Sequence, residues 1–99
     1  MVYNDVYVSC GPGWKDLYEP LIDLCKLKDI RVDQVKEKFG GLRFYVNRPD
    51  LDTIIHAAEL LSWKLCETCG TEADVTLNTT GWRKTLCDLC RKKRNDDKP

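Results

Sequence analysis

The chain has 99 residues, a formal net charge of zero, 42% hydrophobic residues and 32% charged residues. This length fits one domain, or one domain with a small appendage, and the composition fits a soluble globular protein rather than a disordered one. Zero net charge excludes a bulk electrostatic attraction for nucleic acid or for an anionic membrane. No apolar run approaches the ~18 residues of a membrane span, and no signal peptide is recognisable, so we expect a cytoplasmic protein without a membrane partner.

The N-terminal third is predicted to form a strand and a helix. Residues 2–8 are rich in strand-forming residues and predict a short strand, and residues 10–13 predict a turn. Pro20 lies inside the following helical pattern, and we expect it to kink or divide the helix. The apolar residues spaced three and four apart, which predict the buried stripe of this helix, are Trp14, Leu17, Leu21, Leu24 and Leu27.

Two further cysteines, Cys10 and Cys25, lie in this part of the chain. Our interpretation is that both are small buried hydrophobic residues. A disulfide between them, or a second metal site with His56, is the alternative, although their spacing does not favour it.

Residues 30–47 predict a β-hairpin, because Gly40 and Gly41 separate two strand-like segments. A Gly-Gly pair supplies the positive φ angles that two-residue hairpin turns require. With these glycines as the loop, the residues opposite each other are Phe39 and Leu42, Lys38 and Arg43, and Glu37 and Phe44. The predicted core face then consists of Val35, Phe39, Leu42, Phe44 and Val46.

The other face of this hairpin is basic, and it carries Lys36, Lys38, Arg43 and Tyr45. Like charges directly opposite each other destabilise a sheet by roughly a few tenths of a kcal/mol. One interpretation is a solvated face on which Asp or Glu from elsewhere relieves the repulsion. The other is an anion-facing patch on which Tyr45 offers a stacking surface.

A second helix is predicted over residues 50–65, with Asp50 as its N-cap. The apolar stripe expected to face the core consists of Leu51, Ile54, Ile55, Ala58, Leu61 and Leu65. His56, the only histidine, lies off this stripe, and we expect a surface residue without a catalytic role.

Four cysteines near the C-terminus have the spacing C-x2-C-x17-C-x2-C, and they are Cys66, Cys69, Cys87 and Cys90. Two residues between cysteines let both sulfurs of a pair point at one centre, and two pairs complete the tetrahedral shell of a structural Zn²⁺ ion. The alternatives are two disulfides or four buried free thiols. We therefore expect one zinc ion held by these four residues.

The segment around these cysteines predicts a knuckle, a hairpin and a helix in the treble-clef arrangement. Gly70 suits a knuckle turn that requires positive φ, residues 75–86 predict strand, turn and strand, and Cys87 is expected to open a helix. The complete prediction is an α+β fold. It has an α+β core at residues 1–65, a docked zinc-binding module at residues 66–94 and a disordered tail at residues 95–99.

The cysteine segment resembles the zinc finger of the DksA/TraR-type RNA-polymerase regulators. The shared residues are Cys66, Cys69, Gly70, Leu86, Cys87 and Cys90. This resemblance covers about a quarter of the chain. Residues 1–65 contain a hairpin rather than the long helical coiled coil of that family, so its polymerase mechanism is not implied.

Most of the chain resembles a family of small zinc-binding proteins of tailed bacteriophages. The segments that carry the resemblance are Gly13-Trp14, the Lys-Glu-Lys-Phe-Gly-Gly-Leu-Arg-Phe-Tyr stretch at residues 36–45, Cys66-x2-Cys69-Gly70 and Gly81-Trp82-x2-Thr85-Leu86-Cys87. The resemblance implies a phage or prophage origin, a bacterial host cytoplasm and a zinc site. It implies no activity.

A non-enzymatic interaction protein is the function that these features favour, because four thiolates leave no open metal position and no catalytic motif is present. The expected partner is a host or phage protein of transcription, replication or defence, and no small-molecule substrate is expected. The alternative is direct DNA or RNA binding through two basic clusters. The first is the hairpin face, and the second consists of Arg83, Lys84, Arg91, Lys92, Lys93 and Arg94. A treble-clef nuclease is disfavoured, because His56 has no partner pattern.

Overall fold

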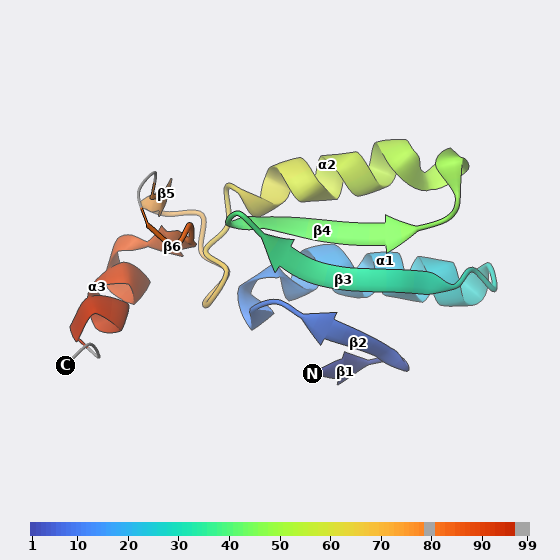
Figure 1. The fold of residues 1–99 in the computed structure, drawn as a ribbon, viewed down its shortest axis with the longest axis horizontal. Helices are drawn as coiled ribbons and strands as arrows, with labels where there is room; N and C mark the ends of the chain where they lie inside the picture. Colours follow the sequence, from blue (N-terminus) through green and yellow to red (C-terminus); the bar gives the residue numbers. More distant parts are fainter. Residues whose placement is uncertain (79–80, 97–99) are drawn as a thin grey trace.

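The computed structural model describes residues 1–78 and 81–96, which form an α+β fold (Figure 1). Two short 3-10 helices, Pro12–Trp14 and Pro49–Leu51, precede the first two α-helices. Among the described residues, no helix is long and apolar enough to cross a membrane. The elements in chain order are β1 (Val2–Tyr3), β2 (Val6–Ser9), α1 (Lys15–Leu27), β3 (Val32–Lys38), β4 (Gly41–Val46), α2 (Asp52–Ser62), β5 (Val75–Leu77), β6 (Thr85–Cys87) and α3 (Asp88–Asp96).

The first six of these elements form a sheet with two helices packed against it. The strand order is β1-β2-β3-β4, with β2 and β3 parallel and the other neighbours antiparallel. Helix α1 connects the parallel pair, and α2 runs along β4 (Figure 1). The two helices also contact each other, and the core between them and the sheet includes Val8, Trp14, Tyr18, Ile22, Val35, Leu42 and Phe44.

The strand predicted at residues 2–8 is two strands joined by a tight turn. Asn4 and Asp5 have φ angles of 46° and 68°. Two successive residues of positive φ are typical of the two-residue hairpin loop, and Asn and Asp are the non-glycine residues that tolerate this conformation best. The prediction of one continuous strand was therefore wrong, because the turn residues lie among strong strand formers.

Helix α1 is rotated relative to its predicted buried stripe. Its buried residues are Tyr18, Leu21, Ile22 and Cys25, whereas Leu27 is 87% exposed. Tyr18 and Cys25 occupy the positions next to the predicted Leu17 and Leu24, so the stripe moves by one residue around the helix. The helix continues through Pro20 without a break, and the division expected there does not occur.

The β3–β4 hairpin turns at Phe39 and Gly40 rather than at Gly40 and Gly41. Both turn residues have positive φ, and Lys38 pairs with Gly41. This change moves the partner of each residue by two positions, so Lys36 lies opposite Arg43. Because side chains alternate with a period of two, the core face keeps Val35, Leu42, Phe44 and Val46, and only Phe39 leaves it.

Helix α2 closes the free edge of the sheet with two of its side chains. The Ser62 hydroxyl accepts a hydrogen bond from the Leu42 backbone N–H at 2.9 Å, and the Glu59 carboxylate accepts one from the Phe44 backbone N–H at 3.0 Å. Leu42 and Phe44 are alternate residues of the edge strand β4, so their N–H groups point the same way. The helix therefore supplies the acceptors that a further strand would supply.

Two predictions for α2 are wrong. Ile54 and Leu61 are about half exposed, so the buried face consists of Leu51, Ile55, Ala58 and Ser62. The predicted N-cap Asp50 instead binds the Arg48 guanidinium through both carboxylate oxygens, each at 2.9 Å. This contact lowers the pKa of the Asp50 carboxyl.

The C-terminal segment continues from α2 into a two-stranded sheet, β5–β6, and then α3. The predicted hairpin and helix are present, although Cys87 ends β6 instead of opening the helix. The turn predicted at residues 78–81 includes residues 79 and 80, which lie outside the described residues. In the predicted tail, Asn95 and Asp96 belong to α3, and residues 97–99 lie outside the described residues.

Replacement of Ser62 by Ala tests the closure of the sheet edge. The Leu42 N–H would stay buried without an acceptor, and we expect a loss of about 1–3 kcal/mol in the free energy of unfolding. Urea denaturation followed by circular dichroism measures this loss. Thr53→Ala, an exposed change on the same helix, is the matched control, and equal losses in the two variants would contradict the prediction.

Candidate metal centre

The four cysteines predicted from spacing lie together at the junction of the two sheets. Cys66 and Cys69 follow α2, Cys87 ends β6, and Cys90 lies in the first turn of α3. Their four Sγ atoms all lie within 4.8 Å of one another, and the Sγ atoms of Cys69 and Cys87 are 3.8 Å apart. This group could hold a metal ion, and the described residues contain no other group of this kind.

Backbone N–H groups point at the sulfurs of this cluster. Burial raises the pKa of the Cys66 thiol, but the N–H groups of Cys69, Cys87 and Thr68 outweigh burial and bring the pKa to about 6. Burial and the neighbouring sulfurs raise the pKa of Cys90 to about 12. These N–H groups therefore favour the thiolate form of Cys66, which is the form that a metal ligand requires.

The first cysteine pair lies on a knuckle, residues 66–70, whose geometry agrees with its sequence. Gly70 has a φ of 82°, and its N–H donates to the Cys66 carbonyl at 2.9 Å. The knuckle is held on its other side by β6, because the Glu67 N–H donates to the Thr85 carbonyl at 3.0 Å. The positive φ predicted for Gly70 is confirmed.

The knuckle packs directly on the N-terminal turn at residues 11–13. The Gly13 N–H donates to the Glu67 carbonyl at 2.9 Å, and a Cβ atom at Gly13 would lie only 2.0 Å from the Cys66 carbonyl oxygen. The Trp14 indole N–H donates to the Leu65 carbonyl at 3.0 Å. Backbone meets backbone at this junction, and only glycine permits so close an approach.

The turn of the β3–β4 hairpin packs against the other side of the C-terminal sheet. The Thr85 hydroxyl, which is fully buried, donates to the Gly40 carbonyl. A Cβ atom at Gly40 would lie 2.5 Å from Cδ1 of Leu77 in β5. The hairpin turn is therefore a second contact between the large sheet and the cysteine cluster.

Lys84 links these two contacts through a pair of carboxylates. Its ammonium lies 3.1 Å from Glu67 in the knuckle and 3.3 Å from Glu37 in β3. Burial raises the pKa of the Glu67 carboxyl, and Lys84 acts in the opposite direction. Lys84, predicted as a binding residue, thus has an internal role as an ion bridge across the junction.

Arg91 also has an internal role, although the sequence suggested a binding residue. Its guanidinium donates to the backbone carbonyls of Thr76 and Lys84 at 2.6 Å and 3.2 Å. It also reaches the Asn78 side chain at 3.4 Å. These bonds attach α3 to the β5–β6 sheet.

The hairpin face predicted as a basic patch is partly neutralised. Arg43 lies 3.9 Å from Glu59 of α2, as the solvated-face interpretation expects. The Lys36 ammonium lies over the Tyr45 ring, 5.9 Å from its centroid, and the Lys38 ammonium lies over the Phe39 ring at 5.5 Å. The predicted opposition of Lys38 and Arg43 does not occur, because the register differs.

The remaining basic residues of the predicted binding set are exposed. Lys92, Lys93 and Arg94 lie along α3, and Arg83 precedes β6. None of these four side chains makes an ion pair or hydrogen bond within the described part of the chain. Within the predicted binding set, free basic charge is therefore limited to these four residues and to Lys36 and Lys38.

Cys10, Cys25 and His56 lie outside the cysteine cluster. Cys25 is buried, Cys10 is half-buried and both thiols are free, so no disulfide joins them. Burial, with a smaller contribution from Glu67, raises the pKa of the Cys10 thiol to about 12. His56 is exposed on α2, as the sequence predicted.

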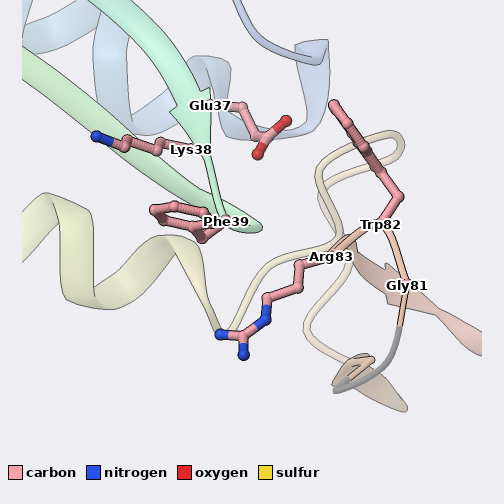
Figure 2. Close-up of a pocket in the computed structure, with 6 residues that line it drawn as sticks. All are labelled: Glu37, Lys38, Phe39, Gly81, Trp82 and Arg83. Carbon is pink, nitrogen blue, oxygen red and sulfur yellow. The ribbon is translucent and has the colours of Figure 1, made fainter.

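An open groove of about 690 Å³, which we call the aromatic groove, lies between the hairpin turn and the segment before β6 (Figure 2). Its lining is formed by Glu37, Lys38, Phe39, Gly81, Trp82 and Arg83. Phe39 and Trp82 were not predicted to form a surface site, because the sequence pattern placed Phe39 in the core and Trp82 in a strand. Phe39 has a φ of 55°, a conformation that phenylalanine rarely adopts, so its residue type did not mark it as a turn residue.

Replacement of Lys84 by Met tests the ion bridge. Glu37 and Glu67 would be left without a cation, and we expect a loss of about 2–4 kcal/mol in the free energy of unfolding. The pKa of Glu67 would rise further, so the variant would bind protons more tightly when folded. Its deficit should therefore be largest where the Glu67 carboxyl is ionised and shrink as the pH falls toward the pKa of Glu67.

Urea denaturation of the metal-loaded protein at two pH values measures this effect. Lys15→Met, an exposed lysine change at the start of α1, is the matched control. Addition of Glu67→Gln to Lys84→Met should restore part of the lost stability. A Lys84→Met protein as stable as the control would contradict a role for the bridge.

Comparison with known proteins gives no information about the cysteine cluster. No protein-family model, no curated protein and no solved structure matches the chain. What the structure provides is an α+β chain with four cysteines placed to hold one metal ion, and an aromatic groove beside them.

Proposed function

We propose that the four cysteines bind one Zn²⁺ ion in a closed, structural site. Zn–S bonds of about 2.3 Å place the sulfurs of a tetrahedron about 3.8 Å apart. The Cys69–Cys87 sulfur distance of 3.8 Å agrees with this value, and all six distances stay below 4.8 Å. Four thiolates fill the shell, so the ion would have no position for water or substrate.

The arrangement around this site supports a treble-clef-like module. A knuckle at residues 66–70 carries the first ligand pair, the β5–β6 hairpin follows, and α3 carries the last ligand. The buried cluster of this module contains Cys66, Leu86 and Cys87, with Val75 and Cys90 beside it. So small a core needs a metal ion to fold, and binding would supply that free energy.

We infer that the protein is a non-enzymatic interaction module whose partner is another protein. The observation that supports this inference is the aromatic groove, in which the Phe39 and Trp82 side chains are 61% and 73% exposed. Exposed aromatic side chains in a groove mark interaction sites. The resemblance to phage proteins directs the search toward host or phage transcription, replication and defence proteins.

Direct nucleic-acid binding is the second candidate, and the exposed row Lys92, Lys93 and Arg94 on α3 favours it. The internal roles of Lys84 and Arg91 and the ion pair of Arg43 reduce the basic surface on which this candidate depends. Phosphate contacts need free cations, and zero net charge gives little long-range attraction.

Zinc content tests the metal assignment. We expect one zinc ion per chain by elemental analysis, with all four cysteines protected from alkylation. Removal by a strong chelator should unfold β5, β6 and α3, because their small core depends on the ion. Zinc retained at one ion per chain by a Cys66→Ser, Cys90→Ser double variant would contradict the assignment.

Affinity capture from a bacterial lysate tests the partner class. The tagged, zinc-loaded protein should retain one or a few specific proteins after treatment with DNase and RNase. Capture that is lost on nuclease treatment, and lost again in a Lys92→Glu, Lys93→Glu variant, would favour the nucleic-acid candidate. If the protein captures neither a protein nor a nucleic acid, with or without nuclease treatment, both candidate functions are contradicted.

A further inference from the structure

The walls of the aromatic groove are held by contacts that do not involve the aromatic side chains themselves. Phe39 belongs to a turn whose next residue, Gly40, donates its N–H to Glu37 at 3.0 Å and accepts from Thr85 through its carbonyl. The segment that carries Trp82 is closed by Asn78, whose side chain donates to the Trp82 carbonyl at 2.7 Å. Hydrogen bonds thus hold the backbone at Gly40 and at the Trp82 carbonyl, and both aromatic side chains remain largely exposed.

The charges around this groove are separated. Lys38 and Arg83 are exposed, and Figure 2 shows their charged groups pointing to different sides of the Phe39 ring. The Glu37 carboxylate lies between Phe39 and Trp82 in the same view. Glu37 shares the single cation Lys84 with Glu67, so the floor of the groove carries no excess of positive charge. The groove therefore presents two cations at its edges, with two exposed aromatic rings and the Glu37 carboxylate in between.

We propose that the aromatic groove binds a short acidic segment of a partner protein, an inference that rests on the protein-binding function above. A large apolar side chain of the segment lies between Phe39 and Trp82. Carboxylates on either side of that anchor meet Lys38 and Arg83. Separate cations beside two exposed aromatic rings match a peptide whose carboxylates flank a hydrophobic residue.

Single-stranded nucleic acid fits the same groove less well. A nucleic-acid strand carries a phosphate at every nucleotide, whereas this groove offers only two separated cations, Lys38 and Arg83. The Lys38 ammonium lies over the Phe39 ring, 5.5 Å from its centroid. That position occupies one face of the ring on which a base would stack. The observations therefore favour the peptide.

The test uses the zinc-loaded, full-length protein and a fluorescein-labelled peptide of about ten residues, in which Trp or Leu is flanked by glutamates. Fluorescence anisotropy should show saturable binding that weakens with added salt, since the contacts include ion pairs. Arg83→Glu and Trp82→Ser should each weaken binding by about tenfold or more. A peptide with lysines in place of the glutamates should not bind.

Matched controls separate the groove from the general surface. Lys15→Glu reverses an exposed charge on α1, and Leu27→Ser removes an exposed apolar side chain at its end. Neither should change the affinity for the peptide. Zinc content and thermal unfolding should be unchanged in the Arg83 and Trp82 variants, because both side chains are exposed.

Three outcomes would overturn the proposal. The acidic peptide would not bind, it would bind equally to Arg83→Glu and Trp82→Ser, or an oligo-dT strand of about ten nucleotides would bind in its place. If the acidic peptide fails while a nuclease-resistant protein is still captured from lysate, the acidic-segment proposal is wrong and the protein-binding function stands. If both fail, the protein-binding function falls as well.

Discussion

The close approach of two backbone segments, residues 11–13 and residues 66–70, is the constraint on which the rest of the structure depends. Cβ atoms at Gly11 and Gly13 would lie 2.1 Å and 2.0 Å from the carbonyl oxygens of Glu67 and Cys66. The second segment also carries half of the cysteine cluster. The large sheet and the cluster therefore form one body, and a metal ion in the cluster would stabilise both sides of the junction. The aromatic groove has one wall on the β3–β4 hairpin and the other on the segment before β6, so its shape depends on how these two parts are held together.

The cysteine cluster could be predicted from the sequence because its geometry is set by ligand chemistry. Four thiols at this spacing can meet at one point whatever the surrounding fold, and the structure brings them together. The faces of the hairpin were equally predictable, because strand alternation survives the two-position change in register that moved the turn to Phe39. The second α-helix and the β5–β6 hairpin were also present where the pattern placed them.

The roles of single charged residues could not be predicted, because they depend on contacts between distant segments. Lys84 and Glu37 are 47 positions apart, and only the packing of the hairpin turn on β6 makes them partners. The basic cluster predicted from the sequence therefore included two residues, Lys84 and Arg91, whose side chains bind other parts of the same chain. The stripe of α1 failed for a different reason. Apolar residues surround that helix widely enough for two neighbouring faces to satisfy the helical period, and tertiary packing selects Tyr18 and Ile22.

The side chains of Ser62 and Glu59 have a consequence for how this protein meets other chains. By occupying the outward N–H groups of β4, they remove the edge on which a partner could add a strand. The opposite edge is β1, which has only two residues and offers a short template. Recognition through shared main-chain hydrogen bonds is thus unfavourable at both edges. A partner that meets the four-stranded sheet is therefore recognised through side chains, and copies of the chain are hindered from pairing edge to edge through this sheet.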